Sequence, residues 1–207
     1  MLVCFAVKEE AGAFQQLVEG RHNLKVILVG LGKRNAERAI RAALAAEQPE
    51  LVLTCGFAGG LRPEWAMGTV VFDADTETGL EAALLAAGAK RARFHCAERL
   101  AATAQAKRAL RECTGADAVE MESQSIGAVC RERKIPCATV RVILDSAQED
   151  LPLDFSRAMT PGQQISYGKL ALALMKSPRK VSGLLQLQRH AKAAAEKLGQ
   201  VLAGLLP

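Results

Sequence analysis

The sequence is poor in the residues and patterns that mark metal, redox and nucleic-acid proteins. Its 207 residues include one Trp, one Tyr and three His, and its six cysteines form no Cys-x-x-Cys pair. The histidines, His22, His95 and His190, are far apart in the chain, so both the ligand spacing of a zinc site and the motif of a dithiol enzyme are missing. We therefore expect free cysteines, no metal site and no bound cofactor.

Long apolar runs are also missing. No run approaches the roughly 20 apolar residues that a membrane-spanning helix requires, and the first residues, MLVCFAV, carry no basic leader or cleavage site. We expect a cytoplasmic location. Half of the residues are hydrophobic and 24% are charged, a composition and length typical of one domain with a sizeable core. Residues 1–207 are therefore expected to form a single domain.

The net charge of +5 is carried by the C-terminal end of the chain. From Lys169 onward there are seven Lys or Arg and one acid, Glu196. Residues 178–207 predict a basic amphipathic helix, which usually covers its own sheet or a partner subunit and whose leucines among cations also suit an anionic membrane surface. Nucleic-acid binding is not expected, because aromatic side chains that stack on bases are missing there.

Short apolar runs alternate with helical patterns along the first two thirds of the chain. Strands are predicted over residues 2–7, 24–29, 51–55, 69–74, 116–121 and 136–144. Helices are predicted over residues 33–47, 99–113, 122–134, 165–176 and 181–206. This alternation indicates an α/β fold, a single domain with a mixed, mostly parallel central sheet flanked by helices.

Acids and glycines follow the ends of these strands. They are Glu9 and Glu10 after the first, Gly30 and Gly32 after the second, GFAGGL (residues 56–61) after the third, Glu120 and Glu122 at the fifth, and Asp145 after the sixth. In open α/β sheets, ligands bind outside the carboxyl ends of the strands. The coincidence at one sheet edge therefore predicts a binding site.

Each acid also has a structural explanation. Glu9 and Glu10 are favourable first-turn acids of a helix, Glu120 or Glu122 suits the start of the helix at residue 123, and Asp145 suits a cap on the amides that follow it. Structural and functional explanations stay open for each residue taken alone.

The glycines around Phe57, Ala58 and Gly59 suggest a backbone that comes close to something. Three glycines directly after a buried strand allow close approach to an anion or to a flat ligand face, and a tight strand exit explains them equally well. We place Phe57, Ala58 and Gly59 among the candidate substrate-binding residues.

Three acids at one edge suit cleavage of a bond to a sugar. A carboxylate accepts hydrogen bonds from both hydroxyls of a vicinal diol, so a strand-end Glu beside a Met suits a ribose ring. Negative charge near that ring stabilises the positive sugar that forms as its bond to the leaving group stretches. A separate acid whose pKa is raised by burial can protonate the departing group.

Four segments carry a family resemblance. KEEA (residues 8–11), GFAGGL, AVEMES (residues 118–123) and VRVILDSA (residues 140–147) resemble, in order and spacing over residues 1–175, the nucleoside phosphorylase superfamily. That superfamily includes purine nucleoside phosphorylases and methylthioadenosine/S-adenosylhomocysteine nucleosidases. The resemblance implies cleavage of the N-glycosidic bond of a purine nucleoside by phosphate or water, a small-molecule nucleoside as partner, and a homo-oligomer.

The resemblance also implies roles for individual residues. Glu122 would bind the ribose 2′ and 3′ hydroxyls with Met121 packed on the sugar, and Asp145 would protonate a purine ring nitrogen. Glu10 falls where the nucleosidases keep a glutamate that positions the attacking water. Glu120 is assigned a structural role at the same edge.

Three departures from the family pattern bear on substrate choice. Phe57 replaces the small hydroxyl residue that helps phosphorylases hold phosphate. The stretch FHCAERLAATAQ (residues 94–105) lacks the GDxF-like segment that stacks on adenine, and residues 73–93 are too short for the long substrate loop of relatives. Base recognition is therefore open, and the pocket is expected to be open on one side and to admit a bulky nucleoside.

Water and phosphate both remain candidate nucleophiles. Glu10 and Phe57 favour water. Resemblance to the hopanoid-associated phosphorylases, in GFAGGL and in the long basic C-terminal helix, favours phosphate as co-substrate, held by Arg34, Arg62 or Arg141. That subgroup implies a lipid-linked adenosine as substrate and a peripheral membrane contact through the C-terminal helix.

The alternative to an enzyme is a nucleoside-binding protein of the same fold that has lost catalysis. Retention of Glu10, Glu122 and Asp145 argues against it, because a binding protein has little use for a buried acid at position 145.

Overall fold

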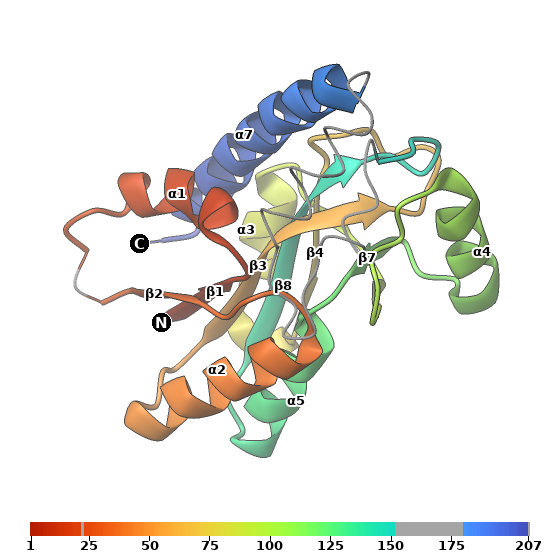
Figure 1. Ribbon diagram of the computed structural model, residues 1–207. Coiled ribbons are helices and arrows are strands. Elements are labelled where there is room, and N and C mark those ends of the chain that lie inside the picture. Colours follow the sequence, from red (N-terminus) through yellow and green to blue (C-terminus); the bar gives the residue numbers. More distant parts are fainter. Residues whose placement is uncertain (22, 152–179, 207) are drawn as a thin grey trace.

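A computed structural model describes residues 1–21, 23–151 and 180–206 of the chain. In this part of the chain an eight-stranded sheet runs through the molecule and helices cover both of its faces (Figure 1). The predicted α/β fold with a mixed, mostly parallel sheet is therefore confirmed.

The sheet is built around β3 and β8. Its strands are β1 (Leu2–Phe5), β2 (Lys25–Leu28), β3 (Val52–Gly60), β4 (Val70–Ala74), β5 (Lys90–Arg91), β6 (Phe94–Cys96), β7 (Ala118–Glu120) and β8 (Cys137–Asp145). The order along the sheet is β2-β1-β3-β8-β4-β5, in which β4 is antiparallel to β8 and the other neighbours are parallel. β7 pairs antiparallel with the end of β3 and parallel with β6.

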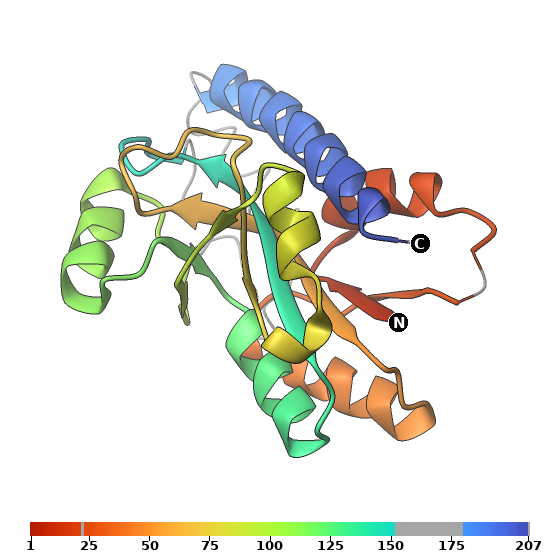
Figure 2. The same cartoon turned by 180° about the vertical axis from the view of Figure 1, so that it is seen from behind.

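The helices form two layers. They are α1 (Lys8–Leu17), α2 (Lys33–Ala46), α3 (Glu81–Ala86), α4 (Ala104–Thr114), α5 (Ser123–Glu132) and α7 (Lys180–Gly204), with a 3₁₀ turn at Thr76–Thr78. α1, α3 and α7 lie on one face of the sheet and share one hydrophobic core with it, while α2 and α5 pack on the other face around a second core. α4 stands beside β7, at the edge where β3 and β8 end (Figures 1 and 2).

The six predicted strands are present, but the prediction was wrong about where the third one ends. β3 runs through the glycine-rich segment to Gly60, because residues 56–60 pair with β8 on one side and with β7 on the other. The ladder to β8 is irregular between Ala58 and Gly59, as at a β-bulge. GFAGGL is thus the end of a central strand and not the loop after it.

The other differences lie at short elements and at helix boundaries. β5, β6 and α3 were not predicted, and α1 begins at Lys8 directly after the first strand. The helix predicted over residues 99–113 begins only at Ala104, where the Thr103 hydroxyl accepts a hydrogen bond from the Ala106 amide and caps it. The helix predicted over residues 165–176 lies outside the described residues.

The basic C-terminal helix covers the protein's own core. Leu198, Val201 and Leu202 of α7 are buried in the same cluster as Phe14 of α1. Gly199 lies so close to α1 that an added Cβ would stand 3.1 Å from the Phe14 amide nitrogen. This half of the apolar face is therefore covered by the protein and is not free for a membrane.

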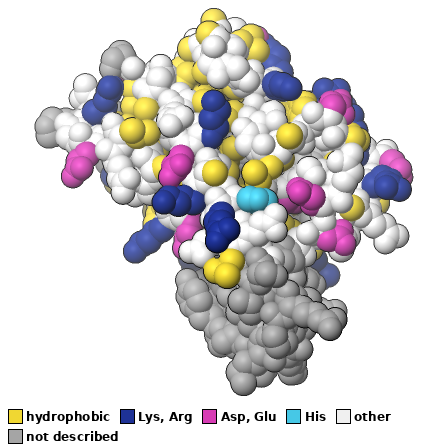
Figure 3. Space-filling view, turned by 90° about the horizontal axis from the view of Figure 1, so that it is seen from above, with side chains coloured by type: hydrophobic (Ala, Val, Ile, Leu, Met, Phe, Trp, Pro, Cys, Tyr) yellow, Lys and Arg dark blue, Asp and Glu magenta, His cyan; other side chains and the backbone are white. Residues whose placement is uncertain are grey.

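The face of the molecule that carries α7 shows no broad basic patch among its coloured side chains. Lys and Arg are interspersed there with Asp and Glu, and hydrophobic side chains lie in small groups (Figure 3). In the described ranges, no helix is both long enough and apolar enough to cross a membrane.

The packing of α7 predicts a large difference between two of its leucines. Leu198 is 0% exposed and Leu185 is 54% exposed, so Leu198→Ala should lower the free energy of unfolding by about 2–4 kcal/mol and Leu185→Ala by less than about 0.5 kcal/mol. Urea unfolding of both variants tests this. Equal effects would show that α7 does not pack on the core as described.

Candidate active site

A buried arginine lies at the centre of the predicted site. Arg141 is in the middle of β8 and is only 2% exposed. Its Nη2 donates to Glu120 Oε2 at 2.8 Å and to Thr54 Oγ1 of β3 at 3.1 Å, and lies 3.9 Å from Glu122 Oε2. Burial opposes the charged form, but the carboxylates of Glu120, Glu122 and Glu10 raise the pKa of Arg141. One cation therefore faces three glutamates.

The carboxylate of Glu120 is hydrogen-bonded to the residues that begin α5. Its Oε2 accepts hydrogen bonds from the amides of Glu122 (3.0 Å) and Ser123 (2.8 Å), and its Oε1 accepts one from the Ser123 hydroxyl (2.7 Å). Burial alone would raise the pKa of Glu120, but Arg141 and these donors lower it. Glu120 is thus an ionised acid that starts α5, in line with its predicted structural role.

Glu122 lies next to Glu120 but differs from it in protonation. It is the residue before α5, and its Oε1 accepts a hydrogen bond from the Gly32 amide at 2.7 Å. Burial raises the pKa of Glu122 to about 7, against the opposing effect of Arg141. The pair Glu120 and Glu122 therefore consists of one firmly ionised acid and one that gains or loses its proton near neutral pH.

Glu10 comes from the first turn of α1 and reaches the same region. Its Oε2 accepts hydrogen bonds from the amides of Ala6 (2.9 Å) and Val7 (3.2 Å), and its Oε1 accepts one from the amide of Phe57 (2.8 Å). Burial raises the pKa of Glu10 although Arg141 and these donors oppose it. Glu10 therefore completes the start of a helix and also lies near the other acids around Arg141, while its role in positioning water stays a prediction.

A glycine makes room for this carboxylate. Gly56 has φ +147°, and an added Cβ would lie 2.6 Å from Glu10 Oε1. Gly59 differs, because the nearest atom to its added Cβ would be Val119 Cγ1 at 3.1 Å, and Asp145 Oδ2 at 3.5 Å would be at an ordinary contact distance. At Gly56, the close approach suggested by GFAGGL is made to the protein's own Glu10.

Asp145 is the last residue of β8 and is 8% exposed. Its Oδ2 is in contact with the ammonium group of Lys107 from α4. Burial raises the pKa of Asp145, while Lys107 opposes the rise. Asp145 thus has the environment of an acid that retains its proton to higher pH than an exposed aspartate.

A small pocket joins Asp145 to part of the predicted substrate site. It has a volume of about 30 Å³ and is lined by Gly59, Arg99, Leu100, Ala101, Val119, Glu120, Met121 and Asp145. This is room for about one water molecule and not for a purine ring. The side chains of Phe57 and Ala58 pack instead with the hydrophobic cores on the two faces of the sheet.

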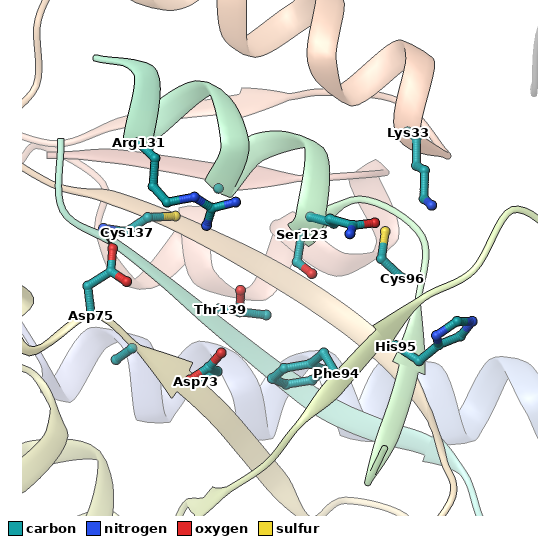
Figure 4. A pocket seen from close by; sticks show the side chains of 13 residues that line it. Lys33, Asp73, Asp75, Phe94, His95, Cys96, Ser123, Arg131, Cys137 and Thr139 are labelled. Atoms are coloured by element: carbon teal, nitrogen blue, oxygen red, sulfur yellow. Dashed lines mark hydrogen bonds between the residues drawn. The ribbon is translucent and has the colours of Figure 1, made fainter. Parts of the chain in front are cut away.

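A larger cavity lies beside these acids and contains none of the predicted site residues. Its volume is about 360 Å³, and side chains of β4, β6, α5 and β8 line it (Figure 4). Asp73 and Asp75 stand toward one end, and Lys33, His95 and Cys96 toward the other (Figure 4). This cavity lies between α5 and the segment that follows β4, and a substrate pocket open on one side stays a prediction.

The three arginines proposed to hold phosphate have different surroundings. Arg34 is exposed at the start of α2. Arg62 pairs with Asp117 (3.1 Å) and Glu64 (3.4 Å) and lies 5.2 Å from the centre of the Trp65 ring. Of these three arginines, only Arg141 lies among the acids of the site, and its positive charge is balanced by their carboxylates.

Two partners were missed by the sequence analysis. Arg141 appeared only as a phosphate ligand, although an arginine inside the apolar run VRVIL signals a buried counter-charge. Lys107 was not considered; its signal is a lysine three residues before Leu110, on a helix face expected to be apolar. Among the described residues no group of three or more His, Cys, Asp or Glu is placed to hold a metal ion.

Part of the chain is similar in sequence to a protein-family model and to a curated nucleosidase. The family model described as the phosphorylase superfamily matches residues 71–170. A curated aminodeoxyfutalosine nucleosidase of Campylobacter jejuni is 40% identical over 63 residues, which are 30% of this chain and 28% of that protein. The match thus spans less than a third of that relative's length.

Solved structures share the fold over nearly the whole chain. The 5′-methylthioadenosine/S-adenosyl homocysteine nucleosidase of C. jejuni aligns with a TM-score of 0.70 and 17% identity, covering 99% of this chain and 96% of that one. The futalosine hydrolase of Helicobacter pylori gives 0.70 and 16%, covering 99% and 95%. The nucleosidase of Neisseria meningitidis in complex with methylthio-immucillin-A gives 0.71 and 17%, covering 99% and 96%.

The contact between Gly56 and Glu10 predicts that two substitutions will not be additive. Gly56→Ala should lower the free energy of unfolding by about 2–4 kcal/mol through backbone strain and displacement of Glu10. In a Glu10→Ala background the added methyl group meets no carboxylate, so the loss should be smaller by at least about 1 kcal/mol. Chemical unfolding of the four proteins measures this coupling.

Gly79→Ala is the matched control, because Gly79 has φ +66° and open space around its Cβ position. It carries backbone strain without a clash, and its effect should be the same in both backgrounds. An additive result for Gly56→Ala would mean that Gly56 does not make room for Glu10.

Proposed function

We propose that this protein, whose residues 71–170 match the family model of the phosphorylase superfamily, cleaves the N-glycosidic bond of a purine nucleoside, of the adenosine type. The observation that carries the proposal is that Glu10 and Glu122 lie around Arg141, that Asp145 ends the same strand as Arg141, and that all three acids are buried with raised pKa values. Structural acids at a helix start have no need of raised pKa values, as Glu120 illustrates.

Asp145 is the general acid of this proposal. A carboxyl group that keeps its proton near neutral pH can transfer it to a purine ring nitrogen as the bond to the sugar breaks. Asp145 shares a small pocket with Met121 and Gly59, and the proposal assigns the base to this side of the site. The leaving purine then departs as a neutral molecule.

Glu122 and Met121 hold the sugar. The free Oε2 side of Glu122, beside Arg141, accepts hydrogen bonds from the ribose hydroxyls. Its negative charge also stabilises the positive charge that spreads over the ring in the transition state. Met121 lies between the two acids in sequence and lines the pocket, where its thioether suits the sugar face.

Water is the favoured nucleophile. Arg141, the one arginine of the three candidates that stands among the acids, faces three carboxyl groups, so the site has no net positive charge to attract a phosphate dianion. Glu10, with its raised pKa, is suited to orient a water molecule and accept its proton. The futalosine hydrolase and the methylthioadenosine nucleosidases that share the fold are enzymes of this reaction class.

The proposed substrate carries a bulky group at the ribose 5′ position. A short segment between β4 and β6 and the cavity beside it favour a nucleoside with a bulky 5′ group. A lipid-linked adenosine is the extreme member of that series, with membrane contact limited to the first half of α7, where Leu185 is exposed. The competing function is nucleoside binding without turnover.

Adenine release from a panel of nucleosides tests the proposal. The panel contains adenosine, inosine, 5′-methylthioadenosine and adenosines with longer 5′-alkyl groups, each with and without phosphate. We expect adenine release that does not require phosphate, and a loss of about 10²-fold or more in kcat/KM for Asp145→Asn and for Glu122→Gln. Glu9→Gln, which changes an exposed acid next to Glu10, should leave the rate unchanged.

Three other outcomes would change the assignment. A requirement for phosphate would make the protein a phosphorylase. Full activity of Glu122→Gln would remove the ribose role. No release from any nucleoside, together with equal adenosine binding by the wild type and by Asp145→Asn, would favour the binding protein.

A further inference from the structure

Helix α4 buries a lysine where a helix normally buries an apolar residue. Lys107 is 0% exposed and is the only fully buried residue of α4, while its neighbour Arg108 faces solvent. An ammonium group taken out of water is strongly unfavourable unless its charge and its donors are all paired. The position of Lys107 therefore requires a specific set of partners.

Three oxygen atoms surround the Lys107 ammonium. Nζ donates to the carbonyl oxygens of Ser146 at 2.7 Å and Glu149 at 2.8 Å, and it contacts Asp145 Oδ2. An ammonium has three N–H donors and a neutral amine has two, so this arrangement of three acceptors suits the charged form. Every donor of the buried lysine is directed at Asp145 or at the loop that follows it.

Other contacts tie the same loop to α4. Asp150 Oδ1 accepts a hydrogen bond from the Ala104 amide at 2.7 Å, at the start of the helix. The Leu151 amide donates to the Ala102 carbonyl at 2.8 Å. The loop after β8 is thus joined to the segment that precedes Lys107, next to the pocket wall to which residues 99–101 contribute.

We propose that Lys107 is a positioning residue for Asp145, which holds the carboxyl group toward the pocket and stabilises the carboxylate that remains after the proton has left. This inference rests on the function proposed above. The Asp145 carboxyl gives its proton to a ring nitrogen of the purine, and the electron pair of the N-glycosidic bond stays with the purine. Lys107 gains and loses no proton; its charge pairs with the carboxylate so formed.

The contact has a defined effect on acidity. A positive charge in contact with a carboxyl group favours its ionised form, so Lys107 limits the rise in the pKa of Asp145 that burial causes. Among the residues that the structure describes, the other charged groups near Asp145 are Glu149 in the following loop, and Arg99 and Glu120 in the pocket wall. Glu149 raises the pKa of Asp145, so Lys107 is the group that keeps the acid strong enough to donate.

The pH profile of nucleoside cleavage tests this role. A general acid works in its protonated form, so kcat/KM falls as the pH rises through its pKa. In Lys107→Met the pKa of Asp145 rises, and this decline should move to higher pH by about one to three units, with a lower kcat and little change in KM. Lys107→Arg, which keeps the charge, should restore most of the wild-type profile.

Two further variants control for the loss of any cation from α4 and for failure of Lys107→Met to fold. Arg108→Met removes an exposed cation from the same helix and should leave the profile unchanged. Lys107→Gln keeps two N–H donors for the carbonyls of Ser146 and Glu149 without the charge. If Lys107→Met does not fold, the same upward shift in the pH of the kcat/KM decline is expected for Lys107→Gln. An unmoved decline in a folded, active Lys107→Met or Lys107→Gln protein overturns the proposal.

A measurement without turnover separates this inference from the proposed function. Carbon-13 NMR of the Asp145 carboxyl group, assigned by its loss in Asp145→Asn, gives the pKa directly. An upward shift in Lys107→Gln together with a decline of cleavage that moves in parallel supports the proposal. Unchanged pKa values overturn it. A shifted pKa in a protein that cleaves no nucleoside overturns the proposed function and with it the role of Lys107 in proton transfer.

Discussion

The charge of Arg141 is the interaction on which the site depends. Three buried glutamates at the edge of one sheet repel one another and lose their hydration, and each is unfavourable as a carboxylate unless a cation faces it. Arg141 supplies that cation from the middle of β8, with its Nη2 on Glu120 and the Glu122 carboxylate 3.9 Å away. Because it serves Glu120 most directly, Glu120 stays ionised while Glu122 and Glu10 have raised pKa values.

The unequal distances of the three glutamates from the charge of Arg141 link the fold to the proposed chemistry. The ionised Glu120 fixes the start of α5, and Glu122 is thereby held between Gly32 and Arg141. Asp145, at the end of the same strand as Arg141, has its own cation in Lys107. Two cations thus oppose the effect of burial on four acids, and the proposed function assigns structural, sugar-binding and proton-donating roles to acids whose surroundings differ in this way.

The sequence predicted the sheet, its main strands and the edge where the acids meet, because alternation of apolar runs and helical patterns is a local signal. It did not predict that β3 continues to Gly60, since the glycines there are stabilised by pairing with β7 and β8, which lie far along the chain. The short strands β5 and β6 have too few residues to show a pattern. The pairing of Arg141 and Lys107 with buried acids was not predicted, because their partners are distant in the sequence and become neighbours only in the folded protein.

The unfolding free energy of Arg141→Met at pH 5 and at pH 8 tests the central claim most directly. Without the cation, the folded state keeps the three glutamates protonated, so their pKa values rise and stability is lost as the pH increases above their usual values. The account predicts a loss relative to wild type of about 3–5 kcal/mol at pH 8 and a clearly smaller loss at pH 5. An equal loss at both pH values would contradict it, because Arg141 would then contribute packing and not charge.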